Sequence, residues 1–235
     1  MASDALARTA PGSAGAGKFD RSAAITRSLL GYGVVAGPFY LLTGLIQAFA
    51  RDGFDLARHP LSALANGPGG WVQTANFVLS GLMVVAAAMG FARVLRPQSR
   101  TVGWFLGAFG AAMLVAAVFP ADPVDGFPVG TPEGMPTSIS TPGMVHFIAG
   151  TLGFLGLGVA CLVTARAMSR RNERSLARLS FVSGLVVVAA FFGGAAFSSS
   201  SAGIAGIWLS VVVGWAWLAL MSVRLYRAAP DPNCA

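Results

Sequence analysis

The stretch from residue 52 to residue 77, DGFDLARHPLSALANGPGGWVQTANF, gathers polar side chains that could bind a ligand or carry out chemistry. The candidate site residues within it are Arg58, His59, Ser62, Asn66, Gln73 and Asn76. Two further candidates, Asp122 and His146, lie in and after a second polar stretch, and the chain has only two histidines. The sequence around both stretches is almost entirely apolar, so this concentration of polar groups predicts a site.

One hypothesis for this site is metal-dependent hydrolysis of a lipid or lipid-linked substrate. Imidazole and carboxylate groups are ligands of catalytic zinc, which keeps one open position for water. His59, Asp122 and His146 could hold such an ion, which would lower the pKa of its bound water. Asp55 is a further candidate ligand, and Ser62 could orient the substrate. The competing interpretation is structural: His59 caps a turn, and His146 hydrogen-bonds Asp122.

Binding without chemistry is the second hypothesis and the one that we favour. A small polar ligand or a lipid headgroup fits a polar pocket among helices. Arg51 and Arg58 could contact a phosphate or carboxylate group. Transport is disfavoured, because no inverted repeat is evident and no acidic residue lies deep in an apolar segment. A third hypothesis is that the polar side chains only tie helices together through hydrogen bonds.

The apolar composition of the chain predicts an integral membrane protein. Of its 235 residues, 55% are hydrophobic and 11% are charged, whereas soluble domains carry about 25% charged residues. About 20 apolar residues cross the hydrocarbon core of a bilayer, and the sequence offers six such runs. They cover residues 28–50, 71–92, 101–119, 143–165, 176–197 and 204–223. We therefore expect an all-α bundle of six transmembrane helices within residues 28–226.

The basic residues predict how these helices are oriented. Fourteen of the sixteen Lys and Arg residues lie in the two terminal segments and in the connections after the second and fourth runs. Since cytoplasmic loops carry the excess of Lys and Arg, both termini are expected in the cytoplasm and the protein in the cytoplasmic (inner) membrane. The basic residues, which give the chain a net charge of +7, would then contact anionic membrane lipid. Residues 1–27 are expected to form a disordered cytoplasmic tail, and residues 227–235 a second tail.

Polar residues in the first two runs are spaced to lie on one face of each helix. They recur at steps of three and four: Tyr40, Thr43, Gln47 and Arg51 in the first run, and Gln73, Asn76 and Ser80 in the second. Polar groups that face lipid are costly, so both faces are expected to point inward. Both lie in the outer halves of their helices, which predicts an extracytoplasmic polar pocket roofed by the first and second outer loops.

Several functional classes do not fit the residues. A di-haem cytochrome needs axial ligands on both sides of the membrane, and both histidines are expected on one side. The chain has no P-loop and no dinucleotide-binding fingerprint. The stretch SRRNERS lacks the interleaved aromatic residues of a nucleic-acid site, so no nucleic-acid partner is expected.

The segments RHPLSALANGPGGWVQTANF, FPADP and GMVHF resemble the bacterial and archaeal membrane family known as domain of unknown function 998. The similarity runs from about Ser28 to Tyr226. The resemblance implies a six-helix membrane protein, and it implies no established activity or catalytic residue. The candidate positions that it provides are His59, Ser62, Asn66, Asp122 and His146. Enzyme activity, cofactor and oligomeric state stay open.

Overall fold

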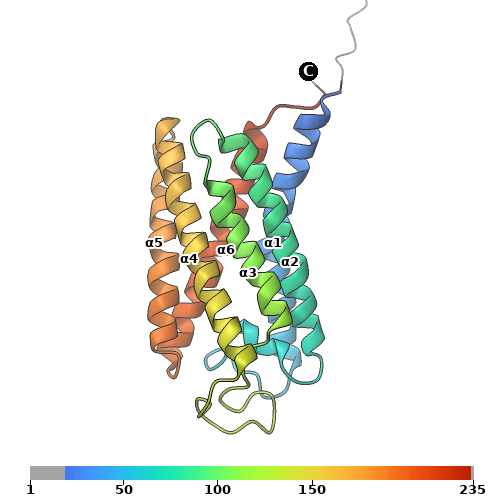
Figure 1. Cartoon of the computed structure of the whole chain (residues 1–235), viewed down its shortest axis with the longest axis vertical. Coiled ribbons are helices and arrows are strands. Elements are labelled where there is room, and N and C mark those ends of the chain that lie inside the picture. Colours follow the sequence, from blue (N-terminus) through green and yellow to red (C-terminus); the bar gives the residue numbers. More distant parts are fainter. Residues whose placement is uncertain (1–18, 234–235) are drawn as a thin grey trace, which may run out of the picture.

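The computed structural model describes residues 19–233 and shows six long helices in this part of the chain (Figure 1). They are α1 (Arg21–Ala50), α2 (Gly70–Leu95), α3 (Val102–Val118), α4 (Thr141–Arg170), α5 (Arg174–Ala196) and α6 (Ser201–Ala228), with a short 3-10 helix η1 (Leu61–Ala65) between α1 and α2. The described residues form no β-strand, and one isolated bridge joins Val124 to Phe127. The prediction of an all-α protein is therefore confirmed.

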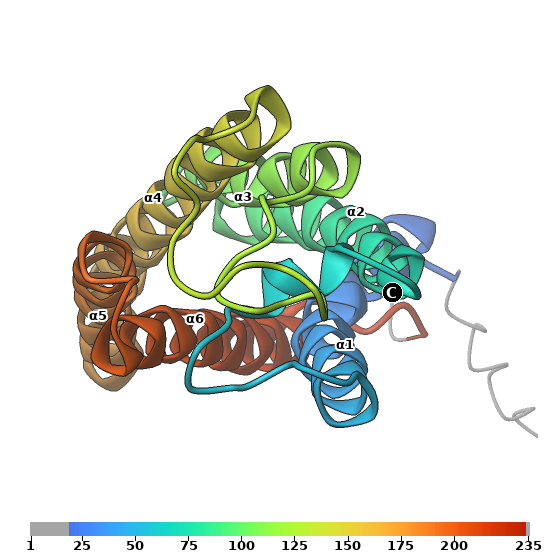
Figure 2. The ribbon, with the colours of Figure 1, turned by 90° about the horizontal axis from the view of Figure 1, so that it is seen from below.

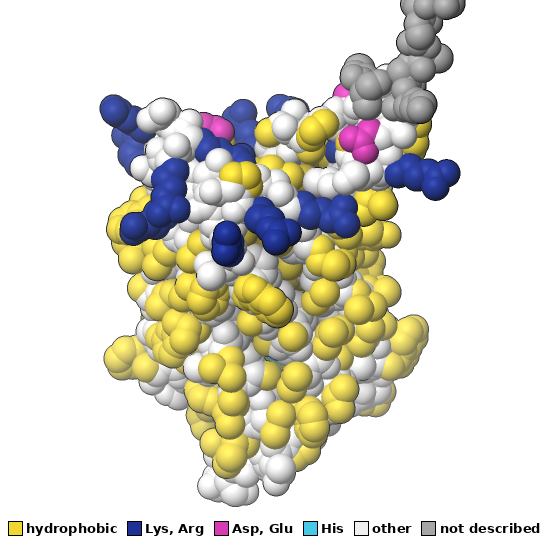
Figure 3. Space-filling view, turned by 45° about the horizontal axis from the view of Figure 1, so that its top comes forward, with side chains coloured by type: hydrophobic (Ala, Val, Ile, Leu, Met, Phe, Trp, Pro, Cys, Tyr) yellow, Lys and Arg dark blue, Asp and Glu magenta, His cyan; other side chains and the backbone are white. Residues whose placement is uncertain are grey.

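The six helices coincide with the six predicted apolar runs, and five of them are long and apolar enough to cross a membrane. The exception is α3, whose 17 residues lie at the lower limit of about 17 for a transmembrane helix. Large apolar side chains face outward, among them Phe49, Trp104 and Phe147. Figure 3 shows this apolar surface below a rim of Lys and Arg side chains. An outer surface of this kind is typical of a multi-pass membrane protein.

The helices form a ring in which each packs against its neighbours in sequence, and α6 closes the ring against α1 (Figure 2). Small residues allow close contact between neighbours. Where α2 crosses α3, a Cβ atom on Gly81 would lie 2.9 Å from the carbonyl oxygen of Gly110, and a Cβ atom on Gly110 would lie 2.9 Å from that of Gly81. Close backbone approach increases van der Waals contact, which is a main attraction between helices in a bilayer.

Helix α1 begins at Arg21, seven residues before the predicted run, because Asp20 caps it. The Asp20 carboxylate accepts hydrogen bonds from the backbone N–H groups of Ser22 and Ala23, which would otherwise lack partners at a helix start. The prediction of a disordered tail is therefore wrong for residues 21–27. Residues 1–18 of that predicted tail lie outside the described residues.

Residues 229–233, which follow α6, pack against the start of α1. The Asp20 N–H donates to the Pro232 carbonyl oxygen at 2.9 Å, and Arg27 forms an ion pair with Asp231 at 3.1 Å. The Arg27 guanidinium also lies over the Tyr226 ring. Both ends of the described chain therefore lie together, at the end of the bundle where Lys and Arg gather (Figure 3).

Candidate functional site

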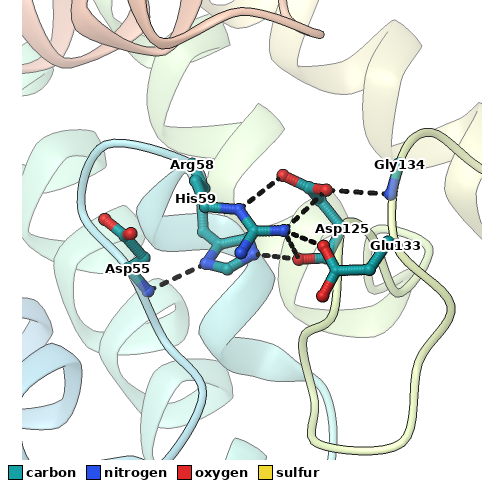
Figure 4. A network of polar contacts seen from close by, with 6 residues as sticks. All are labelled: Asp55, Arg58, His59, Asp125, Glu133 and Gly134. Carbon is teal, nitrogen blue, oxygen red and sulfur yellow. Dashed lines mark hydrogen bonds and ion pairs between the residues drawn. The ribbon is translucent and has the colours of Figure 1, made fainter.

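Two loops cover the opposite end of the ring, and one arginine holds them together. The first loop, residues 51–69, follows α1, and the second loop, residues 119–140, joins α3 to α4. Arg58 Nε donates to Asp125 Oδ2, and Arg58 Nη2 donates to Asp125 Oδ1, each at 2.8 Å. Nη2 also contacts the Glu133 carboxylate (Figure 4). Two-point pairing of a guanidinium with a carboxylate sets both distance and orientation.

His59 lies beside this ion pair and is completely buried. Its Nδ1 accepts the backbone N–H of Asp55 at 2.9 Å, so the ring proton is on Nε2, which donates to the Asp125 carbonyl oxygen at 3.0 Å. The ring also packs against Phe54 and Phe127. His59 therefore shapes the first loop and links it to the second, as the turn-capping interpretation proposed.

The ion pair changes the proton affinity of both partners. The Arg58 guanidinium, assisted by the N–H of Gly134, holds the pKa of Asp125 well below its usual range. The Asp125 and Glu133 carboxylates in turn raise the pKa of Arg58. Sequence reasoning missed both carboxylates as site residues. The dipeptide Asp125-Gly126 is a turn signal, but a local signal cannot identify a partner 67 residues away.

Arg51 stabilises the first loop from within. Its Nη1 and Nη2 atoms donate to the carbonyl oxygens of Leu64 and Asn66 at 2.7 and 2.6 Å, and its guanidinium lies 4.9 Å from the centre of the Phe127 ring. Arg51 and Arg58 thus each direct two of their three guanidinium nitrogens to acceptors inside the protein. The expectation that they contact a phosphate or carboxylate ligand therefore has no support in this geometry.

The predicted polar faces of α1 and α2 meet each other inside the bundle. Gln47 Nε2 donates to Gln73 Oε1 at 2.9 Å, and Asn76 Nδ2 donates to the same oxygen at 3.2 Å. Asn76 Nδ2 also lies 3.1 Å from the Tyr40 carbonyl oxygen, and Ser80 Oγ donates to Asn76 Oδ1 at 3.2 Å. All these side chains are buried, which confirms the inward orientation. Gln73 and Asn76 tie α1 to α2, as the third hypothesis expected.

A cavity of about 310 Å³ lies next to this polar contact, among η1, α3, α4, α5, α6 and the second loop. Five polar lining residues lie in loops or near helix ends: Arg58, Ser62, Asp122, His146 and Ser198. A sixth, Tyr40, lies within α1. Its deeper lining is aromatic and includes Phe109, Phe154 and Phe191. The rings of Phe154 and Phe191 are stacked, with centroids 4.3 Å apart. The cavity therefore mixes polar and apolar groups at its loop end and is aromatic at its deeper end.

Four of the predicted site residues line this cavity, and four do not. Arg58, Ser62, Asp122 and His146 line it, whereas His59, Asn66, Gln73 and Asn76 belong to the surrounding contacts. Asp122 accepts hydrogen bonds from the backbone N–H and the hydroxyl of Ser140. His146 Nδ1 donates to the Phe119 carbonyl oxygen at 2.9 Å, and not to Asp122 as the structural interpretation expected. Its Nε2 atom is thus the nitrogen that can accept a hydrogen bond.

The predicted zinc ligands His59, Asp122 and His146 do not form a metal centre. In the chain from residue 19 to residue 233, no group of three or more His, Cys, Asp or Glu side chains is placed to hold a metal ion. His59 uses both ring nitrogens for contacts with backbone groups, and both oxygens of Asp122 contact Ser140. The metal-dependent hydrolase hypothesis therefore lacks its ligand set, and a zinc cofactor does not fit these residues.

Comparison with known proteins identifies a family, and that family has no assigned activity. A family model described as protein of unknown function (DUF998) matches residues 34–224. The match contains all six helices in whole or in large part, both loops and every residue that lines the cavity. No curated protein and no solved structure matches the chain.

Proposed function

The chain belongs to the DUF998 family, and we propose that it binds an amphipathic molecule in the cavity among α3, α4, α5 and α6. The observation that carries this proposal is the chemical division of the cavity. Polar groups occupy the end beneath the loops, and aromatic side chains line the deeper end. Ligand sites of this kind combine a mainly apolar lining with a few polar groups that fix orientation.

The polar end favours a head group that is uncharged or cationic. Arg58 is already paired with Asp125 and Glu133, so its charge is compensated before any ligand enters. Asp122 adds a further carboxylate to the lining. His146 offers an acceptor at Nε2, because its Nδ1 proton is used by a backbone carbonyl. A hydroxylated or amine-bearing head group matches these acceptors, whereas a phosphate would meet the Asp122 carboxylate and a guanidinium whose charge is already compensated.

The apolar part of the lining favours a hydrocarbon chain that enters from the bilayer. Phe147 lines the cavity and is also 59% exposed on the outer surface of α4, so the cavity reaches the surface that faces lipid. Met135 and Ile139 of the second loop likewise line it and are exposed. Each methylene group transferred from water to such a site contributes about 0.8 kcal/mol. A ligand that already resides in the membrane gains less from this transfer, so the polar head decides its selectivity.

The distribution of charge supports a cavity that opens toward the extracytoplasmic side. The rim rich in Lys and Arg lies at the end opposite the two loops (Figures 1 and 3), and such a rim is expected on the cytoplasmic side. Since both ends of the described chain lie at that rim, we propose that the N-terminus and C-terminus are cytoplasmic. Labelling of single cysteines placed in either loop, in intact cells with a membrane-impermeant reagent, tests this orientation.

Blocking the cavity tests the proposed function directly. A Cβ atom at Gly150 would meet only the edge of Phe191, at 3.8 Å, so Gly150→Leu should fill the cavity without disturbing the helices. Gly193→Leu is the matched control, because Gly193 is exposed on α5 and has open space around it. Native mass spectrometry of protein purified in mild detergent should show a co-purified amphipathic molecule in the wild type and the control, and much less of it in Gly150→Leu. Equal occupancy in all three proteins would refute the proposal.

A further inference from the structure

We infer that the protein has a second binding site at its arginine-rich end, and that this site takes the phosphate group of an anionic phospholipid. A hollow of about 380 Å³ opens there, between the end of α2 and the start of α3. Its lining residues are Ala92, Arg93, Arg96, Arg100 and Trp104. The inference is independent of the ligand proposed for the cavity, which lies at the other end of the bundle.

Within residues 19–233, the three arginines of this hollow form no ion pair with a carboxylate. Among residues 19–233, ion pairs involve only Arg27 and Arg58. Within these described residues, the three arginines make one side-chain hydrogen bond, from Arg93 to the Thr26 hydroxyl at 3.4 Å. The C-terminal end of α2 carries a partial negative charge of about half an elementary charge, which offsets only a small part of the positive charge of the three arginines. In the described part of the chain, the hollow is therefore a cationic site without a carboxylate partner.

Two arginines from another turn hold this cationic segment in place. Arg170 donates to the Gln98 carbonyl oxygen at 2.7 Å. Arg171 donates to the Val94 carbonyl oxygen at 2.6 Å and to the Gln98 side chain at 2.8 Å. These contacts fix the connection between α2 and α3, and they also bring two further positive charges close to the first three. Like charges repel, so an anion bound in the hollow would stabilise the arrangement.

The aromatic member of the lining points to a lipid as the source of the phosphate. Trp104 lies in the first turn of α3, four residues after Arg100, and is 78% exposed on the outer surface of the helix. Tryptophan favours the depth of lipid head groups, where its ring meets acyl chains and its N–H meets water. Guanidinium groups match the oxygen atoms of a phosphate in planar geometry. A phospholipid can contact both the arginines and the tryptophan. Its phosphate would lie among the arginines, and its glycerol and acyl chains would lie along Trp104.

The test compares lipids and two charge-matched double variants. Arg96→Gln/Arg100→Gln removes two charges from the hollow. Arg178→Gln/Arg227→Gln removes two charges from exposed positions at the same end that make no hydrogen bond or ion pair within the described chain. Native mass spectrometry in mild detergent would follow titration with phosphatidylglycerol, with phosphatidylcholine of the same acyl chains, and with inorganic phosphate. We expect phosphatidylglycerol to bind the wild type and the control variant more tightly than phosphatidylcholine does.

In Arg96→Gln/Arg100→Gln, the affinity for phosphatidylglycerol should fall about twenty-five-fold, since each arginine near a lipid surface contributes roughly a factor of five. Binding of phosphatidylcholine should not change. Inorganic phosphate that competes at concentrations similar to the lipid would support the site and assign its ligand to solution. Equal losses in the two double variants, or equal binding of the two lipids to the wild type, would show that these arginines act only through the net charge of this end, and would overturn the inference.

Discussion

Arg58 and Asp125 are 67 residues apart in sequence, and two hydrogen bonds of 2.8 Å join their side chains. The pair connects the first loop to the second above the cavity. His59 reinforces the same connection, because its Nε2 atom donates to the Asp125 carbonyl oxygen. One residue of the second loop thus receives contacts from two adjacent residues of the first, which makes Asp125 the central contact of the loop cover.

Replacing Asp125 by Asn should loosen this cover. The substitution removes the charge that pairs with Arg58 and leaves the size of the side chain almost unchanged. We expect hydrogen exchange of the backbone amides in residues 51–69 and 119–140 to become several-fold faster, with no change in the helices. Glu133→Gln is the control and should have a smaller effect, because its side chain is 77% exposed. Equal effects of the two variants would mean that Asp125 is not the central contact.

The stability that Asp125 contributes should depend on pH in a defined direction. Arg58 holds the pKa of Asp125 below its ordinary value of 3.8 in the folded protein. A depressed folded-state pKa gives stability that is complete above the ordinary value and is lost as the pH falls through it toward the folded value. The difference in Tm between the wild type and Asp125→Asn should therefore be constant from about pH 7 to pH 5 and shrink below about pH 4. A difference that already shrinks near pH 6 would point to a histidine instead.

His59→Ala should destabilise the protein without changing its metal content. The variant removes the acceptor of the Asp55 N–H, one of the two donors to the Asp125 carbonyl oxygen, and a buried ring packed against Phe54 and Phe127. We expect a loss of about 2–4 kcal/mol in the free energy of unfolding. His146→Ala should cost less, because that ring makes one such contact. Elemental analysis of the wild type and both variants provides the check: stoichiometric zinc in the wild type that disappears in both variants would restore the metal hypothesis.

Gln73→Leu should weaken the contact between α1 and α2. Gln73 Oε1 accepts hydrogen bonds from both Gln47 and Asn76, and the variant leaves both donors buried without that partner. Hydrogen bonds between membrane helices average about 0.6 kcal/mol each, so we expect a loss of about 1–2 kcal/mol. Ser80→Ala removes a single bond and should cost less than half as much. Denaturation in mixed micelles measures both values, and a larger loss for Ser80→Ala would contradict the assignment.

Local patterns were sufficient to predict the helices and the inward faces of the first two. The apolar runs predicted six helices because an uninterrupted apolar stretch of suitable length has few other solutions in a bilayer. The spacing of Gln47, Gln73 and Asn76 predicted buried positions because residues three or four apart share one side of a helix. The start of α1 was missed, since its cap depends on Asp20 and on a contact with Pro232 at the other end of the chain.

The site was only partly predictable, for a related reason. Residue type and position singled out Ser62, Asp122 and His146, which line the cavity. The same reasoning grouped His59 with them as a ligand, although its ring nitrogens are occupied by the backbone. Residue type indicates which groups can bind a metal or ligand. It does not indicate which of those groups are already hydrogen-bonded to other parts of the folded chain.

The sequence by itself therefore determined the apolar helices, their number and the concentration of arginine at one end, because each depends on composition and on spacing within one segment. Only the tertiary structure decided that Arg58 pairs with Asp125, that the polar faces of α1 and α2 bind each other, and that a cavity with an aromatic interior lies among α3, α4, α5 and α6. Those features depend on distances between segments that are remote in the chain, and such distances arise only when the helices pack.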